Sequence, residues 1–134
     1  MSGLTEFLLQ NPVIGITSDV VISKRLQSYP ITIRPMNGEE FAEYQKLSVK
    51  VSGTKAQIKT FDNKRWNEMV VINHVVSPNL RDASLLKDAG CSSPEQFLYK
   101  FFASGEIAAL VEYISALSGF DQSVMELADE VKNS

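Results

Sequence analysis

Histidine and cysteine are the side chains that most often supply a general base or a nucleophile near neutral pH. This chain of 134 residues has one histidine and one cysteine. His74 lies in the apolar segment Val-Val-Ile-Asn-His-Val-Val, and no acid or nucleophile stands at helical spacing beside it. A general base needs a reacting partner within hydrogen-bond distance. We therefore predict that His74 is a structural residue in or near the core.

Cys91 follows Gly90 and precedes a predicted helix that begins at Pro94. A helix N-terminus can lower the pKa of a thiol and make it nucleophilic. The residues that flank Cys91 are not basic, however, which favours an inert thiol. A structural zinc site takes four cysteine or histidine ligands, and one residue of each type predicts no metal site.

Phosphate-binding loops are recognised by closely spaced glycines. The seven glycines of this chain are scattered, and neither G-x-x-x-x-G-K nor G-x-G-x-x-G occurs. The acidic pairs Glu39-Glu40 and Asp129-Glu130 are typical of a helix first turn and of a solvated helix face. The sequence therefore predicts no catalytic residue and no cofactor, and it favours a protein that works by binding another protein.

Length and composition indicate a soluble globular protein. The chain is 44% hydrophobic and 22% charged, and its length suits one domain over residues 1–134. A single cysteine fits a reducing, intracellular setting. The apolar runs are far shorter than the roughly 18 residues needed to span a membrane. Met1 to Gln10 lack the features of a signal peptide, so we expect a cytoplasmic protein without membrane contact.

The net charge of −3 is unevenly distributed. Residues 1–75 hold nine Lys/Arg and seven Asp/Glu, a balance of +2, whereas residues 76–134 hold four and nine, a balance of −5. Nucleic-acid binding needs clustered cations that displace phosphate counterions. The acidic second half therefore argues against nucleic acid as a partner, and its charges are typical of solvated helix faces.

An amphipathic peptide is predicted at residues 1–12. Leu4, Phe7 and Leu8 fall at i, i+3 and i+4, which places them on one face of a short helix. Asn11-Pro12 ends this helix, because the residue before proline is disfavoured in the α region. A helix this short is marginal alone in water. It therefore needs a surface to pack on, either in its own domain or on a partner.

The pattern over the rest of the chain predicts an α+β fold. Residues 20–26 and 31–34 are predicted to form a hairpin, in which Pro30 and Pro35 favour an edge position for the second strand. Residues 56–61 are a candidate third strand. One predicted helix is capped by Asn37 with Glu40 and ends near Val51, and the next is capped by Asp62 and ends at Ser77. Four more helices are predicted: one over residues 81–89, one that begins at Pro94, one over residues 107–119 and one that begins at Asp121. We thus expect a small antiparallel sheet in the N-terminal half, packed with a helical C-terminal half.

Large apolar side chains are the candidates for partner binding. Aromatic and aliphatic anchors on amphipathic helices are the usual contacts in such interfaces. The predicted client or self-association surface consists of Leu4, Phe7, Leu8, Phe101, Phe102, Ile107 and Leu110. The competing interpretation is that these residues build the core. For the long C-terminal helix a core role is favoured, and for the N-terminal peptide both interpretations stay open.

The order of these segments resembles the XkdN-like phage tail assembly chaperones over most of the chain. The N-terminal likeness rests on Leu4-Thr5-Glu6-Phe7-Leu8-Leu9, Val20-Val21-Ile22-Ser23-Lys24-Arg25, Ile31-Thr32-Ile33-Arg34, and Phe61-Asp62 before the Trp66 helix. The denser C-terminal likeness rests on Ser77-Pro78-Asn79-Leu80-Arg81-Asp82-Ala83-Ser84-Leu85-Leu86, Ala89-Gly90, Ser93-Pro94-Glu95-Gln96-Phe97-Leu98, Gly105-Glu106-Ile107, Leu117-Ser118-Gly119-Phe120 and Val131-Lys132-Asn133.

This resemblance implies a protein that is made during assembly of a long-tailed phage or by a prophage. Such chaperones bind the tape measure protein, a long and aggregation-prone helical chain, and keep it soluble until tail tube subunits polymerise around it. Family members are usually absent from the finished virion, and many also occur in a longer, frameshifted form. The implied partner is the tape measure protein. Contact with the tail tube protein and self-association into a homo-oligomer are left open.

Two alternatives remain at this stage. One is a structural protein of the tail, such as a minor tube-completion or connector protein that stays in the virion. The other is a small enzyme that uses Cys91 or His74. Mass spectrometry of purified virions separates the first alternative from a chaperone, and alanine substitution of the two residues tests the second.

Overall fold

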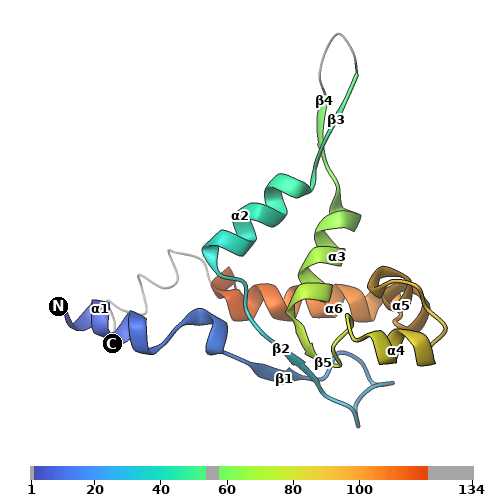
Figure 1. The fold of residues 1–134 in the computed structure, drawn as a ribbon, viewed down its shortest axis with the longest axis horizontal. Helices are drawn as coiled ribbons and strands as arrows, with labels where there is room; N and C mark the ends of the chain where they lie inside the picture. The colour runs from blue at the N-terminus through green and yellow to red at the C-terminus, as the bar shows by residue number, and fades with distance from the viewer. Residues whose placement is uncertain (1, 54–57, 121–134) are drawn as a thin grey trace.

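The computed structural model describes residues 2–53 and 58–120. It confirms the predicted α+β fold, in which helices pack with small antiparallel sheets (Figure 1). In chain order the elements are α1 (Gly3–Gln10), η1 (Val13–Gly15), β1 (Ser18–Val20), β2 (Ile31–Ile33), α2 (Gly38–Leu47), β3 (Val49–Ser52), β4 (Ile58–Phe61), α3 (Asn63–His74), β5 (Val75–Ser77), α4 (Ala83–Asp88), α5 (Pro94–Phe101), α6 (Ser104–Ser115) and η2 (Ala116–Phe120).

A three-stranded antiparallel sheet has the strand order β1–β2–β5. Val20 of β1 lies opposite Ile31 of β2, and Ile33 of β2 lies opposite Val75 of β5. Side chains alternate between the two faces of a strand, and this alternation puts both isoleucines of β2 in the core. The predicted pairing of the strand near residues 31–34 with the strand before it is confirmed.

Two predictions about this sheet are wrong. β2 is the central strand and not an edge strand, because Pro30 and Pro35 lie just outside its residues and interrupt no ladder. The first strand covers Ser18–Val20 and not residues 20–26. The chain turns instead after Lys24, where its carbonyl accepts a hydrogen bond from an amide three residues on.

The segment 75–77 corrects a third prediction. Helix α3 ends at His74, and the residues after it form β5, although they were predicted to continue the helix to Ser77. Val75 and Val76 are β-branched, which by itself slightly favours a strand. Pairing with β2 selects the strand.

A separate two-stranded hairpin, β3–β4, projects from the ends of α2 and α3 (Figure 1). The predicted helix from Asn37 therefore ends at Leu47 and not at Val51. The predicted third strand is confirmed over Ile58–Phe61, but it pairs with β3 rather than with the main sheet. Residues 56 and 57 of that prediction lie outside the described residues.

The helix starts predicted at Asn37, Asp62 and Ser93 are confirmed by their hydrogen bonds, whereas the helices predicted over 81–89 and 107–119 begin at Ala83 and Ser104. The Asn37 side chain accepts from the Glu40 amide at 2.8 Å, and the Glu40 carboxylate accepts from the Asn37 amide at 3.1 Å, which together make a capping box. Asp62 caps α3, and Ser93 caps α5 with Pro94 as the first helical residue. The helix predicted from Asp121 lies outside the described residues.

The core lies where α3 crosses α6, with the main sheet and α5 around it (Figure 1). Its fully buried apolar side chains are Ile33, Val70, Val71, Leu80, Leu98, Leu110 and Ile114. Gly119 ends the helical segment with φ 101°, a left-handed conformation that glycine adopts without strain. This agrees with the predicted helix end at that residue.

Within the described ranges, no single helix is long and apolar enough to cross a membrane. Only α5 and the segment from Ser104 to Phe120, taken together, reach the required length and composition, and the chain bends by 118° between them.

Candidate partner-binding site

Helix α1 exposes the apolar face that the sequence predicted. The Ser2 side chain caps it by accepting from the Thr5 amide at 3.2 Å, and none of its side chains is buried. Phe7 remains 60% exposed and Leu8 58% exposed. The helix extends away from the sheet and helices of the fold (Figure 1). No described part of the chain covers these side chains, which is the condition expected of a segment that docks onto a partner.

The exposed apolar surface continues beyond the residues that the sequence singled out. Leu9 is 70% exposed and Ile14 is 67% exposed. Leu9 lies in α1 but outside the spacing of Leu4, Phe7 and Leu8, and Ile14 lies in η1, so the helical periodicity identified neither. Together with Leu4, Phe7 and Leu8 they form what we call the N-terminal arm, residues 3–16.

A second apolar surface is an open groove of about 580 Å³ beside α5, which we call the α5 groove. It lies between α5, the segment before β2 and the Ser77-Pro78 peptide, which is cis. Its apolar lining consists of Leu26, Tyr29, Pro30, Ile31, Pro78, Phe97, Phe101 and Phe102. The rings of Phe97 and Phe101 lie 4.8 Å apart between centroids, so α5 presents an aromatic wall to the groove.

The other predicted contact residues divide between surface and core. Phe101 is 41% exposed, Phe102 is half-buried, and both line the α5 groove. Ile107 and Leu110 are buried against the core instead, so neither contributes to this groove. The N-terminal arm is at the opposite end of the molecule from α5 (Figure 1), and the structure therefore separates the predicted residues into two surfaces.

An ion pair holds Arg25, which lines the α5 groove, in place. Arg25 Nη2 donates to Glu106 Oε1 at 2.6 Å, and Arg25 Nε donates to Glu106 Oε2 at 3.1 Å. Arg25 Nη2 also donates to the Phe101 carbonyl oxygen at 3.0 Å. The segment before β2 is thus tied both to the first turn of α6 and to the end of α5.

The Glu106 carboxylate is buried and also accepts hydrogen bonds from two further donors. Ser23 Oγ donates to Oε2 at 2.5 Å, and the Ala103 amide donates to Oε1 at 2.7 Å. Hydrogen bonding from Arg25 is the main cause that lowers the pKa of Glu106 to about 2, with the Ser23 and Ala103 donors acting in the same direction against the cost of burial. The position of Glu106 three residues into a helix is a capping signal, but nothing in the sequence identified Arg25 as its partner.

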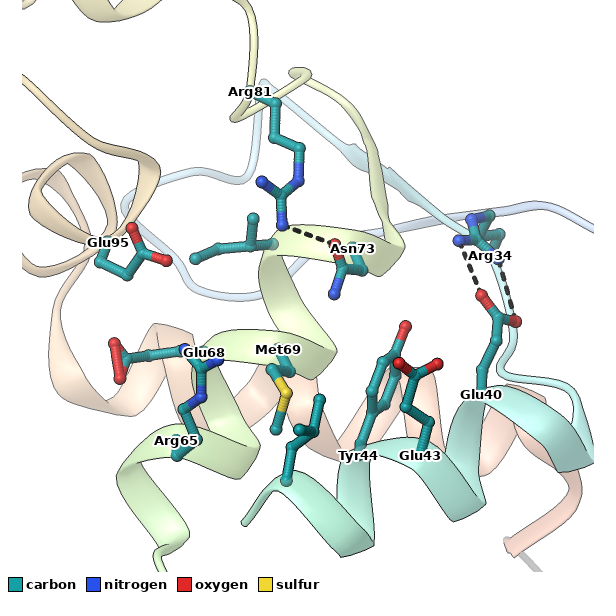
Figure 2. Close-up of a pocket in the computed structure, with 12 residues that line it drawn as sticks. Arg34, Glu40, Glu43, Tyr44, Arg65, Glu68, Met69, Asn73, Arg81 and Glu95 are labelled. Atoms are coloured by element: carbon teal, nitrogen blue, oxygen red, sulfur yellow. Dashed lines mark hydrogen bonds and ion pairs between the residues drawn. The ribbon is translucent and has the colours of Figure 1, made fainter.

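A polar cleft of about 470 Å³ lies on another part of the surface, between α2 and α3 (Figure 2). Arg34 donates to the two carboxylate oxygens of Glu40 at 3.3 and 3.1 Å, and Arg81 donates to Asn73 Oδ1 at 2.8 Å. Four glutamates line this cleft together with three arginines. The lining of this cleft is therefore mostly charged, whereas that of the α5 groove is mostly apolar.

His74 lies beneath the polar cleft with no exposed surface, which confirms its prediction as a core residue. Its Nε2 lies 2.8 Å from the Tyr44 hydroxyl and 3.8 Å from Glu40 Oε2. Burial, followed by the charge of Arg34, lowers the pKa of His74 to about 4, so the ring is neutral near pH 7. Within the described chain, its Nδ1 has no hydrogen-bond partner.

Cys91 is half-buried, and its Sγ lies 3.8 Å from the Ala89 carbonyl oxygen. Over residues 2–53 and 58–120, no group of three His, Cys, Asp or Glu side chains is placed to hold a metal ion. Neither Cys91 nor His74 therefore lies in a described group that could hold a metal, and the candidate partner surfaces remain the N-terminal arm and the α5 groove, although the β3–β4 hairpin also exposes Val49, Val51 and Ile58.

Comparisons with known proteins give one family and one similar fold. The sequence model described as the phage XkdN-like tail assembly chaperone protein, TAC, matches residues 4–132. The crystal structure of the protein yqbn superposes with a TM-score of 0.65 at 18% sequence identity, over 90% of this chain and 99% of that chain. An identity this low shows a shared fold alone. A comparison with curated proteins found no match.

Proposed function

Because this chain belongs to the family of phage XkdN-like tail assembly chaperones, we propose that it binds the phage tape measure protein and keeps it soluble during tail assembly. The observation that carries this proposal is the uncovered apolar face of the N-terminal arm. Phe7 and Leu8 are more than half exposed on a helix that is too short to be stable alone. Docking onto a client removes this apolar surface from water and stabilises the helix at the same time.

The chemistry of the client fits these surfaces. A long helical chain that awaits its tube subunits exposes apolar stripes, and such stripes aggregate unless another protein covers them. A helix presents apolar side chains at i, i+3, i+4 and i+7, and a groove or a second amphipathic helix can cover them. The N-terminal arm and the α5 groove each supply one of these two modes.

The charge of the chaperone supports the same role. The net charge of −3 disfavours association between copies of a complex. A soluble carrier needs such repulsion when it covers an aggregation-prone chain. We propose that this is a non-enzymatic role in which neither Cys91 nor His74 reacts, with protein partners and without nucleic acid or membrane.

We further propose that the protein acts inside the infected or lysogenic cell and is absent from the finished virion. The tape measure protein must be released when the tail tube forms around it, so the chaperone has no place in the particle. Mass spectrometry of purified virions is expected to detect the tube and tape measure proteins without this chain. Its stoichiometric presence would assign it to the tail structure instead.

The direct test is co-expression with the tape measure protein, followed by a solubility assay and a pull-down. The wild-type chain is expected to move the client into the soluble fraction and to co-purify with it. Phe7→Asp with Leu8→Asp is expected to abolish both effects without a loss of thermal stability, because both side chains are exposed. Thr5→Asp with Gln10→Asp adds the same charge to other exposed positions of α1 and serves as the matched control. Client that stays insoluble beside the wild-type chain would contradict the proposal.

A further inference from the structure

We propose that the α5 groove selects amphipathic client helices that carry a carboxylate beside their apolar anchors, and that Lys100 and Arg25 recognise this carboxylate. The inference rests on the proposed client-binding function and names the chemical class of client segment that this groove takes. It follows from the distribution of charge around the groove.

The groove combines an apolar lining with one cation, Arg25, whose partner Glu106 lies outside the lining. Among the described residues that line it, Arg25 is the one charged side chain, and no carboxylate is present. The polar cleft on the same protein carries charges of both signs, with four glutamates and three arginines in its lining. At the open edge of the groove a partner therefore meets an exposed cation whose own carboxylate partner is buried.

Arg25 retains donors for a partner although it is paired with Glu106. Its side chain is 57% exposed, whereas the carboxylate that it holds is 4% exposed. The described hydrogen bonds of Arg25 use Nε and Nη2. A guanidinium has five N–H donors in a planar fork, so the two N–H groups of Nη1 lack a partner among the described residues.

Lys100 does not line the groove, but it supplies a second cation beside the ring of Phe101, which does. Its Nζ lies 5.6 Å from the centroid of the Phe101 ring, and the side chain is on the exposed face of α5. The described residues place no carboxylate within ion-pair distance of this ammonium group. An Asp or Glu on a docked helix can thus pair with Lys100 without first breaking an ion pair among the described residues.

Charge complementarity then favours one type of occupant. Apolar anchors that enter the groove bring their flanking residues to its edge, where an Asp or Glu is attracted and a Lys or Arg is repelled. Such contacts at an exposed edge add modest affinity but discriminate between partners, because the wrong charge is repelled. The N-terminal arm of a second copy, in which Glu6 precedes Phe7, is the competing occupant, and the test must distinguish it from a client helix.

The test uses two synthetic helical peptides with identical Leu and Phe anchors, one flanked by Glu and the other by Lys, and measures binding to the full chain by fluorescence anisotropy. The acidic peptide is expected to bind roughly three- to tenfold more tightly at low salt, and the difference is expected to shrink in about 0.5 M NaCl. Lys100→Glu is expected to reverse the preference, whereas Lys46→Glu on α2 leaves it unchanged. Lys100 takes no part in the Arg25–Glu106 contact, so its substitution leaves that ion pair in place.

The outcomes distinguish this inference from the proposed function. Equal binding of the two peptides, unchanged by Lys100→Glu, would overturn the inference even where the tape measure protein still co-purifies. Failure of the client itself to co-purify would instead remove the proposed function. Sedimentation of the chain alone tests whether a second copy occupies the groove. A dimer that Lys100→Glu dissociates, found together with peptides that do not bind, would assign the groove to that second copy and overturn the inference.

Discussion

Arg25 and Glu106 are 81 residues apart in sequence, yet the guanidinium and carboxylate meet in two hydrogen bonds of 2.6 and 3.1 Å. This bidentate contact joins the segment before β2 to the first turn of α6. It also sets the distance between Arg25 and the aromatic wall of α5. The contact therefore links the stability of the fold to the shape of the α5 groove.

Removing either partner is expected to destabilise the fold, and the two substitutions are expected to differ. Arg25→Gln leaves the buried Glu106 carboxylate without its cation and is therefore expected to lower the free energy of unfolding more than Glu106→Gln does. Glu106→Gln keeps the shape and frees an exposed arginine, which should cost about 1–2 kcal/mol. Urea unfolding measures both, with Glu112→Gln on the exposed side of α6 as the control. A larger loss for Glu106→Gln than for Arg25→Gln would contradict the assigned burial.

The buried state of His74 predicts loss of stability in mild acid. Its folded pKa of about 4 lies below the ordinary value of 6.5, so the unfolded chain binds the proton first. Stability is therefore expected to fall as the pH drops from about 6.5 to about 4, by up to roughly 3 kcal/mol. Because the chain has one histidine, its ring resonances can be followed by NMR without ambiguity. A ring that titrates near pH 6.5 in the folded protein would refute its placement beneath the polar cleft.

Glu106 is expected to act in the same direction at lower pH. Its pKa is lowered to about 2 from an ordinary value of 4.5, so its stabilising effect is complete above 4.5 and is lost as the pH falls toward 2. Acid unfolding followed by circular dichroism should thus be shallower at these pH values for Glu106→Gln than for the wild-type chain. Parallel curves would show that the carboxylate is not held by Arg25.

Gly105 near the start of α6 and Gly119 near the end of η2 form a matched pair, because their backbone conformations predict opposite effects of an alanine substitution. Gly119 has a φ of 101°, which strains any residue with a Cβ, so Gly119→Ala is expected to cost about 1 kcal/mol or more. Gly105 is in the first turn of α6 with no atom near the site of an added Cβ. Gly105→Ala is expected to be neutral or to stabilise by up to about 1 kcal/mol. Thermal unfolding of both variants tests the assigned helix end.

Local signals in the sequence predicted the elements that depend on local interactions. The capping box of Asn37 and Glu40 and the Ser93-Pro94 start involve residues at most three positions apart, so the pattern contains the whole interaction. The alternation of Ile31, Thr32 and Ile33 likewise predicted a half-buried strand, because burial of one sheet face produces it directly.

Non-local pairing explains what the sequence could not predict. The strand at Val75 and Val76 is completed by β2, and Val49 to Ser52 leave the helix where β4 supplies hydrogen bonds. The periodicity over Phe97 to Leu110 also could not separate the groove from the core. Phe101 and Leu110 belong to similar apolar stripes, and the packing of α6 on α3 decides which one is buried.

Hydrogen exchange of the purified complex with the tape measure protein tests the central claim most directly, because it shows which backbone segments the client covers. In the free chain, the amides of the N-terminal arm are expected to exchange rapidly, since no described side chain of α1 is buried. In the complex, strong protection is expected over residues 3–16 and over α5. A stable complex in which both regions exchange as fast as in the free chain, with protection elsewhere, would contradict the account.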